Sequence, residues 1–441
     1  MTTHDKKPLH IIAPDAESAV YRKVARRLIP FLFLLYLVAF IDRVNVGFAK
    51  LQMSGDLGFD EAVYGFGAGI FFLGYFLFEV PSNIILHRVG AKRWISRILL
   101  LWGLISAGML WVDSARSFYL LRFLLGVGEA GFFPGIILYL TYWFPARRRA
   151  KTTASFMTAI AIAGVVGGPV SGWIMAGLDG WLGLRGWQWL FLLEGAPAVL
   201  LGFITQAYLD DGPAQSAWLS EAERQLLLRR LAEDQRAGEA AHGHGTLRQA
   251  LFSGRVWLLA LVYFCLALGM YGISFWLPQI VNDLKQGGLM VTGWLSALPY
   301  LLAALAMVAV AHSSDLRHER RWHIAGSAVV GGLGLVSLVL LRGSPVGSIA
   351  ALGVATSGFL AALSIFWSLP TAFLTGRAAA GGIALINCVG SLGGYFGPVI
   401  LGWVRQNTGD MDAGLYVLSG GMGLAALLVA GMGRRGGAPR L

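Results

Sequence analysis

Residues 27–48 read RLIPFLFLLYLVAFIDRVNVGF, and this stretch sets the class of the protein. No side chain from Leu28 to Ile41 is charged, but Asp42 and Arg43 follow inside the same apolar run. A membrane-spanning helix needs about 20 mostly apolar residues, a length that this run meets. A charge at the bilayer centre costs roughly 2.5–3.5 kcal/mol on insertion scales, so it is a functional-site hypothesis by default.

A second apolar run, Phe118–Phe144, has the same property. Arg122 and Glu129 interrupt it. Both runs therefore hold an acid and a base at membrane depth. This pattern suits the movement of a charged solute, of a proton, or of both.

The composition extends the membrane interpretation to the whole chain. Of its 441 residues, 56% are hydrophobic and 13% are charged, whereas a soluble domain averages about 25% charged residues. Hydropathy predicts about twelve spans, at 28–48, 62–86, 94–112, 118–144, 152–176, 187–209, 252–278, 291–311, 322–341, 347–369, 381–404 and 412–432. The expected fold is an all-α polytopic membrane protein with two six-helix bundles.

These spans divide the chain into five expected parts. They are an N-terminal tail (1–27), a first bundle (28–209), a central loop (210–251), a second bundle (252–432) and a C-terminal tail (433–441). The loops that lie on the side of the tails are rich in Arg and Lys, and the opposite loops hold isolated charges. The positive-inside rule therefore places both termini in the cytoplasm. The net charge of +11 is interpreted as a topology signal, and no nucleic acid is expected as a partner.

The two halves look like a diverged repeat. Gly164-x-x-x-Gly168-Pro169 in the fifth predicted span is echoed by Gly393-x-x-x-Gly397-Pro398 in the eleventh. The basic loop after the second span is echoed by the one after the eighth, at nearly the same offset. Secondary transporters are built from such repeats, with the binding site between them near the membrane midplane.

With these motifs in place, the chain resembles the major facilitator superfamily. The resemblance rests on Arg88-x-Gly90, on Arg122-x-x-x-Gly126-x-Gly128 and on Gly168-Pro169. Within that superfamily the chain resembles the anion:cation symporter family, whose members carry tartrate, phthalate, hydroxyphenylacetate and sugar acids. The stretch 27–48 is the most specific part of the match, and Gly74-Tyr75 and 369–387 resemble the tartrate branch.

The resemblance implies roles for particular residues. Asp42 and Glu129 would carry protons. Arg122 lies seven residues, or two helical turns, before Glu129, so we expect it either to influence that site or to form a structural pair with it. Arg43 would hold the anionic substrate, because a guanidinium offers a planar fork of donors to a carboxylate. The remaining residues expected to line the substrate cavity are Tyr75, Ser364, Trp367 and Asn387, with Tyr271, Trp276 and Gln279 as weaker candidates.

Departures from the family pattern affect two expectations. The fifth span lacks the glutamine of the sugar-acid branch, which disfavours long polyhydroxy acids and leaves tartrate, another short hydroxy-dicarboxylate or an aromatic acid as substrate. Arg88, Gly90 and Asp315 are expected to form a cytoplasmic gate, although His87 replaces the usual aspartate and Leu316 the usual arginine.

The sequence thus predicts a proton-coupled symporter that imports an organic anion by alternating access. It is expected to function as a monomer in a bacterial inner membrane, with the lipid bilayer and a small organic anion as partners. No catalytic residue, metal site or cofactor other than the coupling proton is expected. The alternatives are an efflux antiporter of the same fold, a membrane-embedded enzyme, and a receptor that binds without translocating.

Overall fold

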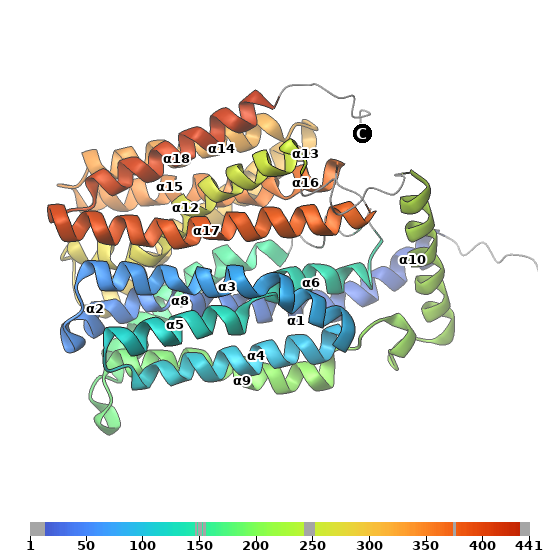
Figure 1. Cartoon of the computed structure of the whole chain (residues 1–441), viewed down its shortest axis with the longest axis horizontal. Coiled ribbons are helices and arrows are strands. Elements are labelled where there is room, and N and C mark those ends of the chain that lie inside the picture. Colours follow the sequence, from blue (N-terminus) through green and yellow to red (C-terminus); the bar gives the residue numbers. More distant parts are fainter. Residues whose placement is uncertain are drawn as a thin grey trace, which may run out of the picture.

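The computed structural model consists of long helices that lie alongside one another (Figure 1). It describes residues 14–145, 148, 152, 156–241, 252–373 and 376–432, and this part of the chain contains no strand. Twelve of the described helical segments are long and apolar enough to cross a membrane. The predicted all-α polytopic fold is therefore confirmed. The predicted tail 433–441, residues 1–13 and residues 242–251 of the predicted central loop lie outside the described residues.

The first half of the chain contains these helices. They are α1 (Pro14–Val44), α2 (Val46–Leu57), α3 (Glu61–Val89), α4 (Ala91–Gly108), η1 (Met109–Trp111), α5 (Ala115–Glu129), α6 (Phe132–Thr141), α8 (Ala159–Gly177), η2 (Trp181–Gly183) and α9 (Gly186–Tyr208). Two helices follow between the halves, η3 (Pro213–Gln215) and α10 (Glu221–Ala241).

The second half contains a further set. They are α12 (Gly254–Asp283), α13 (Leu289–Leu316), α14 (Arg321–Leu340), α15 (Pro345–Phe366), α16 (Ser368–Phe373), α17 (Gly376–Thr408) and α18 (Asp412–Gly431). The helices of each half pack mainly on one another, so the described chain forms two bundles side by side. We call them the N-terminal bundle (α1–α9) and the C-terminal bundle (α12–α18).

The first spanning segment is longer than predicted. It runs over Glu17–Leu57, because α1 begins at Pro14 and α2 continues after a single break at Asn45. Residues 14–27, expected as part of a polar tail, are therefore helical. Asp42 and Arg43 lie in the last turn of α1, just before this break.

Local backbone chemistry fixes two other boundaries. Gly58 adopts a left-handed conformation (φ 68°) and ends α2, and the Asp60 side chain caps α3 by accepting a hydrogen bond from the backbone N–H of Val63 at 2.7 Å. Gly131 is also left-handed (φ 84°) and separates α5 from α6. Glu129 is thus the last residue of α5, beside an irregular segment of backbone.

The two bundles meet mainly where α3 packs on α17 and α8 packs on α13. Figure 1 shows α17 running along α3. A Cβ atom on Gly168 would meet the backbone oxygen of Gly293, and one on Gly65 would meet the backbone of Gly402. These glycines allow the two bundles to touch backbone to backbone, as is common where membrane helices pack closely.

The outer surface of the bundles is apolar. Large side chains such as Leu104, Phe203 and Leu305 are about 60% or more exposed. Contiguous exposed apolar surface marks an interaction site, and here it surrounds helices of membrane-spanning length. The surface therefore fits the hydrocarbon of a bilayer.

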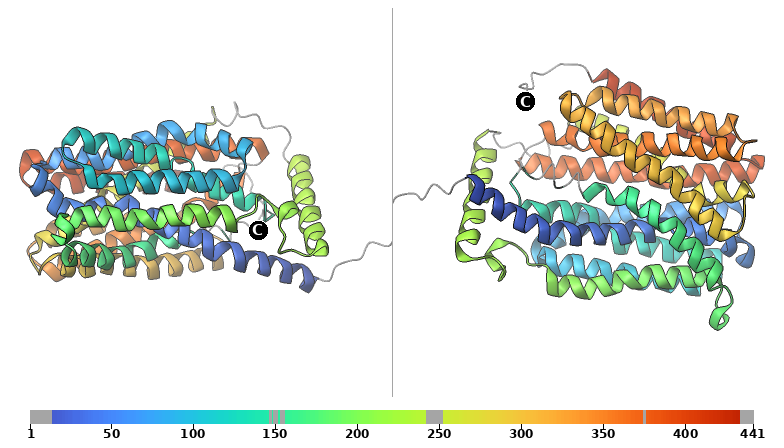
Figure 2. Two further views of the ribbon diagram at one scale, coloured as in Figure 1. Left: turned by 90° about the horizontal axis from the view of Figure 1, so that it is seen from below. Right: turned by 180° about the vertical axis from the view of Figure 1, so that it is seen from behind.

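The helix α10 crosses one end of the molecule at a steep angle to the bundles (Figures 1 and 2). Ion pairs tie it to α1: Lys23 to Glu223 at 2.7 Å and Arg230 to Glu17 at 2.7 Å. The hydrogen bond from Lys23 holds the pKa of the Glu223 carboxyl below its ordinary value. We refer to this end of the molecule as the α10 end and to the opposite one as the far end.

Candidate functional site

Asp42 is buried within the N-terminal bundle and is surrounded by neutral donors. Trp102 donates a hydrogen bond from Nε1 at 2.6 Å, Asn45 donates from Nδ2 at 3.2 Å, and Ser106 donates through its hydroxyl. Only 1% of the residue is exposed, and in the described part of the chain no Lys or Arg forms an ion pair with it. This environment can hold a carboxylate through hydrogen bonds, and it can equally hold a neutral carboxyl. Such a group is suited to gain and lose a proton.

Arg43 connects three elements at the centre of the molecule. It forms an ion pair with Glu129 at the end of α5, and its Nη1 donates to the hydroxyl of Tyr271 in α12 at 2.9 Å. The guanidinium also lies 5.6 Å from the ring centroid of Tyr75, and Nε has no hydrogen-bond partner. Because both members of the ion pair are buried, removal of one charge would leave the other uncompensated.

Arg122 is placed differently from the expected pair with Glu129. Its side chain turns to α3, where Nε and Nη2 donate to the backbone oxygens of Gly67 and Ala68 at 3.2 Å each. Although Arg122 and Glu129 lie on the same helix, Arg43 occupies the ion-pair position beside Glu129. Arg122 is fully buried, so these carbonyls supply much of what water would otherwise supply.

A small central cavity lies between the bundles next to Arg43, with about 20 Å³ available to the centres of water molecules. Of the predicted substrate residues, Arg43, Tyr75 and Asn387 line it, as does the weaker candidate Tyr271. The remaining lining consists of Tyr36, Phe72, Phe133, Met157, Ile160, Tyr263, Met270, Leu363 and Ser391. The cavity thus combines one guanidinium with four tyrosines and a few neutral polar groups.

Two predicted substrate residues lie outside this lining. Ser364 donates to the backbone oxygen of Ala361 in its own helix at 2.8 Å. Trp367 follows the end of α15 and packs against Tyr263 and Phe133, with ring centroids 5.0 and 6.1 Å apart. Trp367 therefore contacts two aromatic side chains that line the cavity without lining it itself.

Two buried acids were missed by the sequence analysis. Glu79 in α3 is fully buried and accepts a hydrogen bond from Nδ2 of Asn387 at 2.5 Å, across the interface between the bundles. Glu194 in α9 is 5% exposed and accepts from Ser171 at 2.8 Å. Both interrupt apolar spans, so the criterion that selected Asp42 and Glu129 would have found them.

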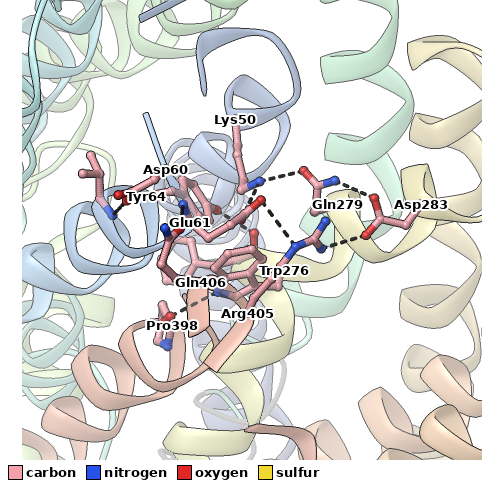
Figure 3. A network of polar contacts seen from close by, with 12 residues as sticks. Lys50, Asp60, Glu61, Tyr64, Trp276, Gln279, Asp283, Pro398, Arg405 and Gln406 are labelled. Atoms are coloured by element: carbon pink, nitrogen blue, oxygen red, sulfur yellow. Dashed lines mark hydrogen bonds and ion pairs between the residues drawn. The ribbon is translucent and has the colours of Figure 1, made fainter. Parts of the chain in front are cut away.

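A polar network joins the two bundles at the far end (Figure 3). Glu61 of α3 pairs with Lys50 at 3.0 Å and with Arg405 of α17 at 3.3 Å. Arg405 also pairs with Asp283 at 2.7 Å, and Lys50 donates to Gln279 at 2.8 Å. The weaker cavity candidate Gln279 therefore belongs to this network, and Trp276 donates to the backbone oxygen of Pro398 nearby.

The predicted gate residues at the α10 end are not joined across the bundles. Arg88 is exposed, and Asp315 pairs with Arg320 of its own loop at 2.5 Å. Gly90 has a positive φ of 96° and precedes α4, where Asp211 accepts from the backbone N–H of Lys92 at 2.8 Å. Among the described residues, the ion pair that crosses between bundles is at the far end. The described residues therefore join the bundles through an ion pair at the far end, and they form no corresponding pair between the bundles at the α10 end.

Comparison with known proteins identifies the class. The model of the Major Facilitator Superfamily matches residues 32–398, so the chain belongs to this superfamily. It is 48% identical, over 95% of its length and 96% of the relative's, to an Agrobacterium vitis protein named for tartrate transport. It is 45% identical to a quinolone resistance transporter of Acinetobacter baumannii, over 92% and 93% of the two chains.

A solved structure shows the same fold. The chain matches a partially occluded inward-open form of the xylose transporter XylE from Escherichia coli with a TM-score of 0.76. The match has 15% sequence identity and covers 94% of this chain and 99% of XylE. The superfamily consists of transporters, so the protein is a multi-pass membrane transporter and not an enzyme. The resemblance to organic-acid transporters agrees with the name of the Agrobacterium relative.

Proposed function

We propose that the protein imports an organic anion together with protons. The observation that carries the proposal is the position of Arg43, which lines the central cavity while paired with Glu129. A substrate carboxylate and the Glu129 carboxylate would compete for the same guanidinium. A proton on Glu129 removes its charge and leaves the guanidinium free to bind the anion. Proton binding and anion binding then support each other, which is the requirement for symport.

Asp42 would serve as the second proton carrier. Its hydrogen-bond partners are neutral, so a proton can join or leave it without breaking an ion pair. Glu129, and not Asp42, is the direct partner of Arg43. Asp42 would act on the site through α1, in whose last turn both residues lie.

The lining of the cavity narrows the substrate class. One guanidinium anchors one carboxylate, and the hydroxyls of Tyr36, Tyr75, Tyr263 and Tyr271 can bind hydroxyl groups of a substrate. A tartrate-like hydroxy acid fits this chemistry. The same rings offer flat apolar surface, so an aromatic carboxylate is the second candidate substrate.

Orientation completes the proposal. The α10 end carries the basic loops, so it would face the cytoplasm of a bacterial cell with both termini there. The far end, closed by the network of Lys50, Glu61 and Arg405, would face outside. Alternation would then break that network and join Arg88 to Asp315 at the cytoplasmic side. A single bundle pair encloses the cavity, which supports a functional monomer.

Uptake into proteoliposomes tests the proposal. The panel contains tartrate, a sugar acid, an aromatic acid and a neutral sugar, with an acidic exterior and with Asp42→Asn as the comparison. We expect one acid to accumulate unmodified, and accumulation to disappear without the proton gradient and in the variant. The proposal fails if the folded wild type accumulates none of the acids.

Efflux by the same fold is the competing function, because the Acinetobacter relative is a quinolone resistance transporter. Proteoliposomes loaded with fluoroquinolone and placed under the same gradient discriminate the two. Proton-dependent loss of the drug, with no uptake of any acid, would favour an antiporter.

A further inference from the structure

Glu194 is a buried acid that the proposed transport cycle has not used. It lies in the middle of α9, and its Oε1 accepts a hydrogen bond from the Ser171 hydroxyl at 2.8 Å. Its second oxygen, Oε2, is buried without a hydrogen-bond partner. A carboxylate oxygen that is buried and unpartnered carries a large desolvation cost, so this site favours a carboxyl group that holds a proton.

Asn45 lies between Glu194 and Asp42. Its Nδ2 donates to Oδ1 of Asp42 at 3.2 Å, and the same side chain lies beside the Glu194 carboxyl. Its own Oδ1 is buried and has no donor. Asn45 Oδ1 and Glu194 Oε2, on two side chains that interact, therefore both lack a hydrogen-bond donor. A protonated carboxyl supplies one O–H donor, so a single proton on Glu194 could satisfy both.

A second small cavity lies beside Asn45 and Ser171, the two side chains next to the Glu194 carboxyl. It has about 20 Å³ available to the centres of water molecules, and a buried water needs roughly 10–15 Å³ by this measure. Asn45 and Ser171 line it, together with Ser274, Ser296 and Tyr300 from the C-terminal bundle. The Ser296 hydroxyl is buried without a partner, so the cavity contains a polar group that water can satisfy.

The charged groups around Glu194 are few. Asp42 of α1 is the ionisable side chain that interacts with it, and α8 contributes the neutral Ser171. The helix α4, which packs along α9, carries its charges Lys92, Arg93 and Arg97 in the half near the α10 end. In the described part of the chain no ion pair to Glu194 is found. The Glu194 carboxyl and Asp42 thus form a pair of acids linked through the Asn45 amide, and Asp42 also interacts with Glu129 and Arg122.

We propose that Glu194 is a proton-loading site that receives protons from the cavity lined by Asn45 and Ser171 and passes them to Asp42. A hydronium in the cavity gives its proton to the Glu194 carboxylate and leaves water. When the Asn45 amide turns aside, the carboxyl O–H gives the proton to the Asp42 carboxylate, and Glu194 is ready to load again. The inference rests on the proposed proton coupling, and it adds a third acid and an entry route to it.

The first test is the variant Glu194→Gln, which keeps the size of the side chain and the bond to Ser171 but cannot carry a proton. Proton-driven uptake should fall by about tenfold, which corresponds to about 1.4 kcal/mol in the activation barrier. Exchange of labelled for unlabelled substrate needs no net proton movement, so it should stay within about twofold of wild type. The matched control is Thr205→Val, which removes another buried, unpartnered oxygen from the same helix and should leave both rates intact.

The outcomes separate the two proposals. If wild type shows no proton-driven uptake, the proposed function fails. If wild type is proton-driven and Glu194→Gln matches it at every external pH, the proton-loading role of Glu194 is wrong while symport stands. Loss of uptake and exchange together, with a lower melting temperature, would assign Glu194 a structural role and overturn the inference.

A second measurement does not depend on transport. Infrared difference spectra of the purified protein at neutral pH, wild type minus Glu194→Gln, should contain the C=O band of a protonated carboxyl. The band should persist in the Asp42→Asn background, because Glu194 loads first. Absence of the band from the wild type at neutral and acidic pH would contradict the inference.

Discussion

The two bundles differ sharply in the charges that they bury. Among the described residues, the buried acidic and basic side chains all belong to the N-terminal bundle: Asp42, Arg43, Lys50, Glu79, Arg122, Glu129 and Glu194. The buried polar side chains of the C-terminal bundle are neutral, and they include Ser274, Thr292, Ser296, Asn387 and Ser391. The cavity between the bundles is therefore charged on one side and neutral on the other.

This difference has an energetic reason. Removing the partner of a buried charge costs about 3–5 kcal/mol, so an ion pair that had to break each time the bundles moved would slow the cycle. The pair between Arg43 and Glu129 lies within one bundle and can move with it as a unit. In the described part of the chain, the hydrogen bond from Arg43 to the neutral Tyr271 and the one from the neutral Asn387 to Glu79 cross the central interface here. Proton and anion chemistry can thus be separated from the motion of the other bundle.

The substitution Arg43→Lys should break this arrangement most severely. An ammonium cannot reproduce the planar fork that binds a carboxylate, so we expect uptake to fall by roughly 100-fold, or about 2.7 kcal/mol. The initial rate of uptake at saturating proton gradient measures the effect, with gel filtration in detergent to show that the variant is folded. Unchanged uptake and affinity would remove Arg43 from the substrate site.

The substitution Glu129→Gln tests the acid side of the comparison. In wild type we expect anion affinity to rise as the external pH falls, because protons on Glu129 free Arg43. The variant mimics the protonated acid at every pH, so its anion affinity should be high and independent of pH. In wild type, where one proton controls the site, the anion affinity should change by up to about tenfold per pH unit. Binding of the transported acid to detergent-solubilised protein, titrated over pH, measures it. A pH profile identical to that of wild type would exclude Glu129.

Tyr271→Phe is the matched change on the neutral side, because Tyr271 is the other side-chain partner of Arg43. A hydrogen bond to a charged group is worth about 1.5–3 kcal/mol at most, and water can replace part of it in the cavity. We expect KM to rise by about three- to tenfold while the pH profile keeps its slope. If Tyr271→Phe made anion affinity independent of pH as Glu129→Gln does, proton binding would not be confined to the N-terminal bundle, and the comparison of the two bundles would be wrong.

Arg405→Gln concerns the place where charges of both bundles do meet, the far-end network. Arg405 is partly exposed, and ion pairs of partly exposed side chains contribute about 1 kcal/mol or less. In the variant, the fraction of molecules open at the far end should therefore rise by about two- to fivefold. Spin labels at Gly180 and Gln286, in loops of different bundles at that end, would report the distances after Cys265 and Cys388 are replaced by Ala. High salt should mimic the variant. Identical distance distributions would show that the network does not hold the far end closed.

The fold was predictable because its determinants are local. A run such as 27–48 is apolar over the length of a bilayer, so the number of spans and the helical class follow from hydropathy. The first span was still underestimated, because residues 14–27 are polar on part of their surface yet continue the helix. Polar composition marks where a helix leaves the bilayer, and it does not mark where the helix ends.

The site was predictable only in part, because pairing depends on how helices face one another. Hydropathy places Asp42, Arg43 and Glu129 inside spans, but the approach of α1 to the end of α5 decides that Arg43 pairs with Glu129. The same tertiary effect turns Arg122 toward carbonyls of α3. Ser364 and Trp367 are three residues apart, which would place them on one face of a continuous helix, but α15 ends at Phe366.

The small size of the central cavity has a consequence for the empty carrier. An organic acid displaces several waters, whereas the cavity as it stands has room for little more than one. In the described conformation the aromatic side chains that line the cavity therefore lie close together. The return stroke would then ferry almost no water and no hydrated ion across the membrane, so the cell could keep many copies of the protein without short-circuiting its own ion gradients.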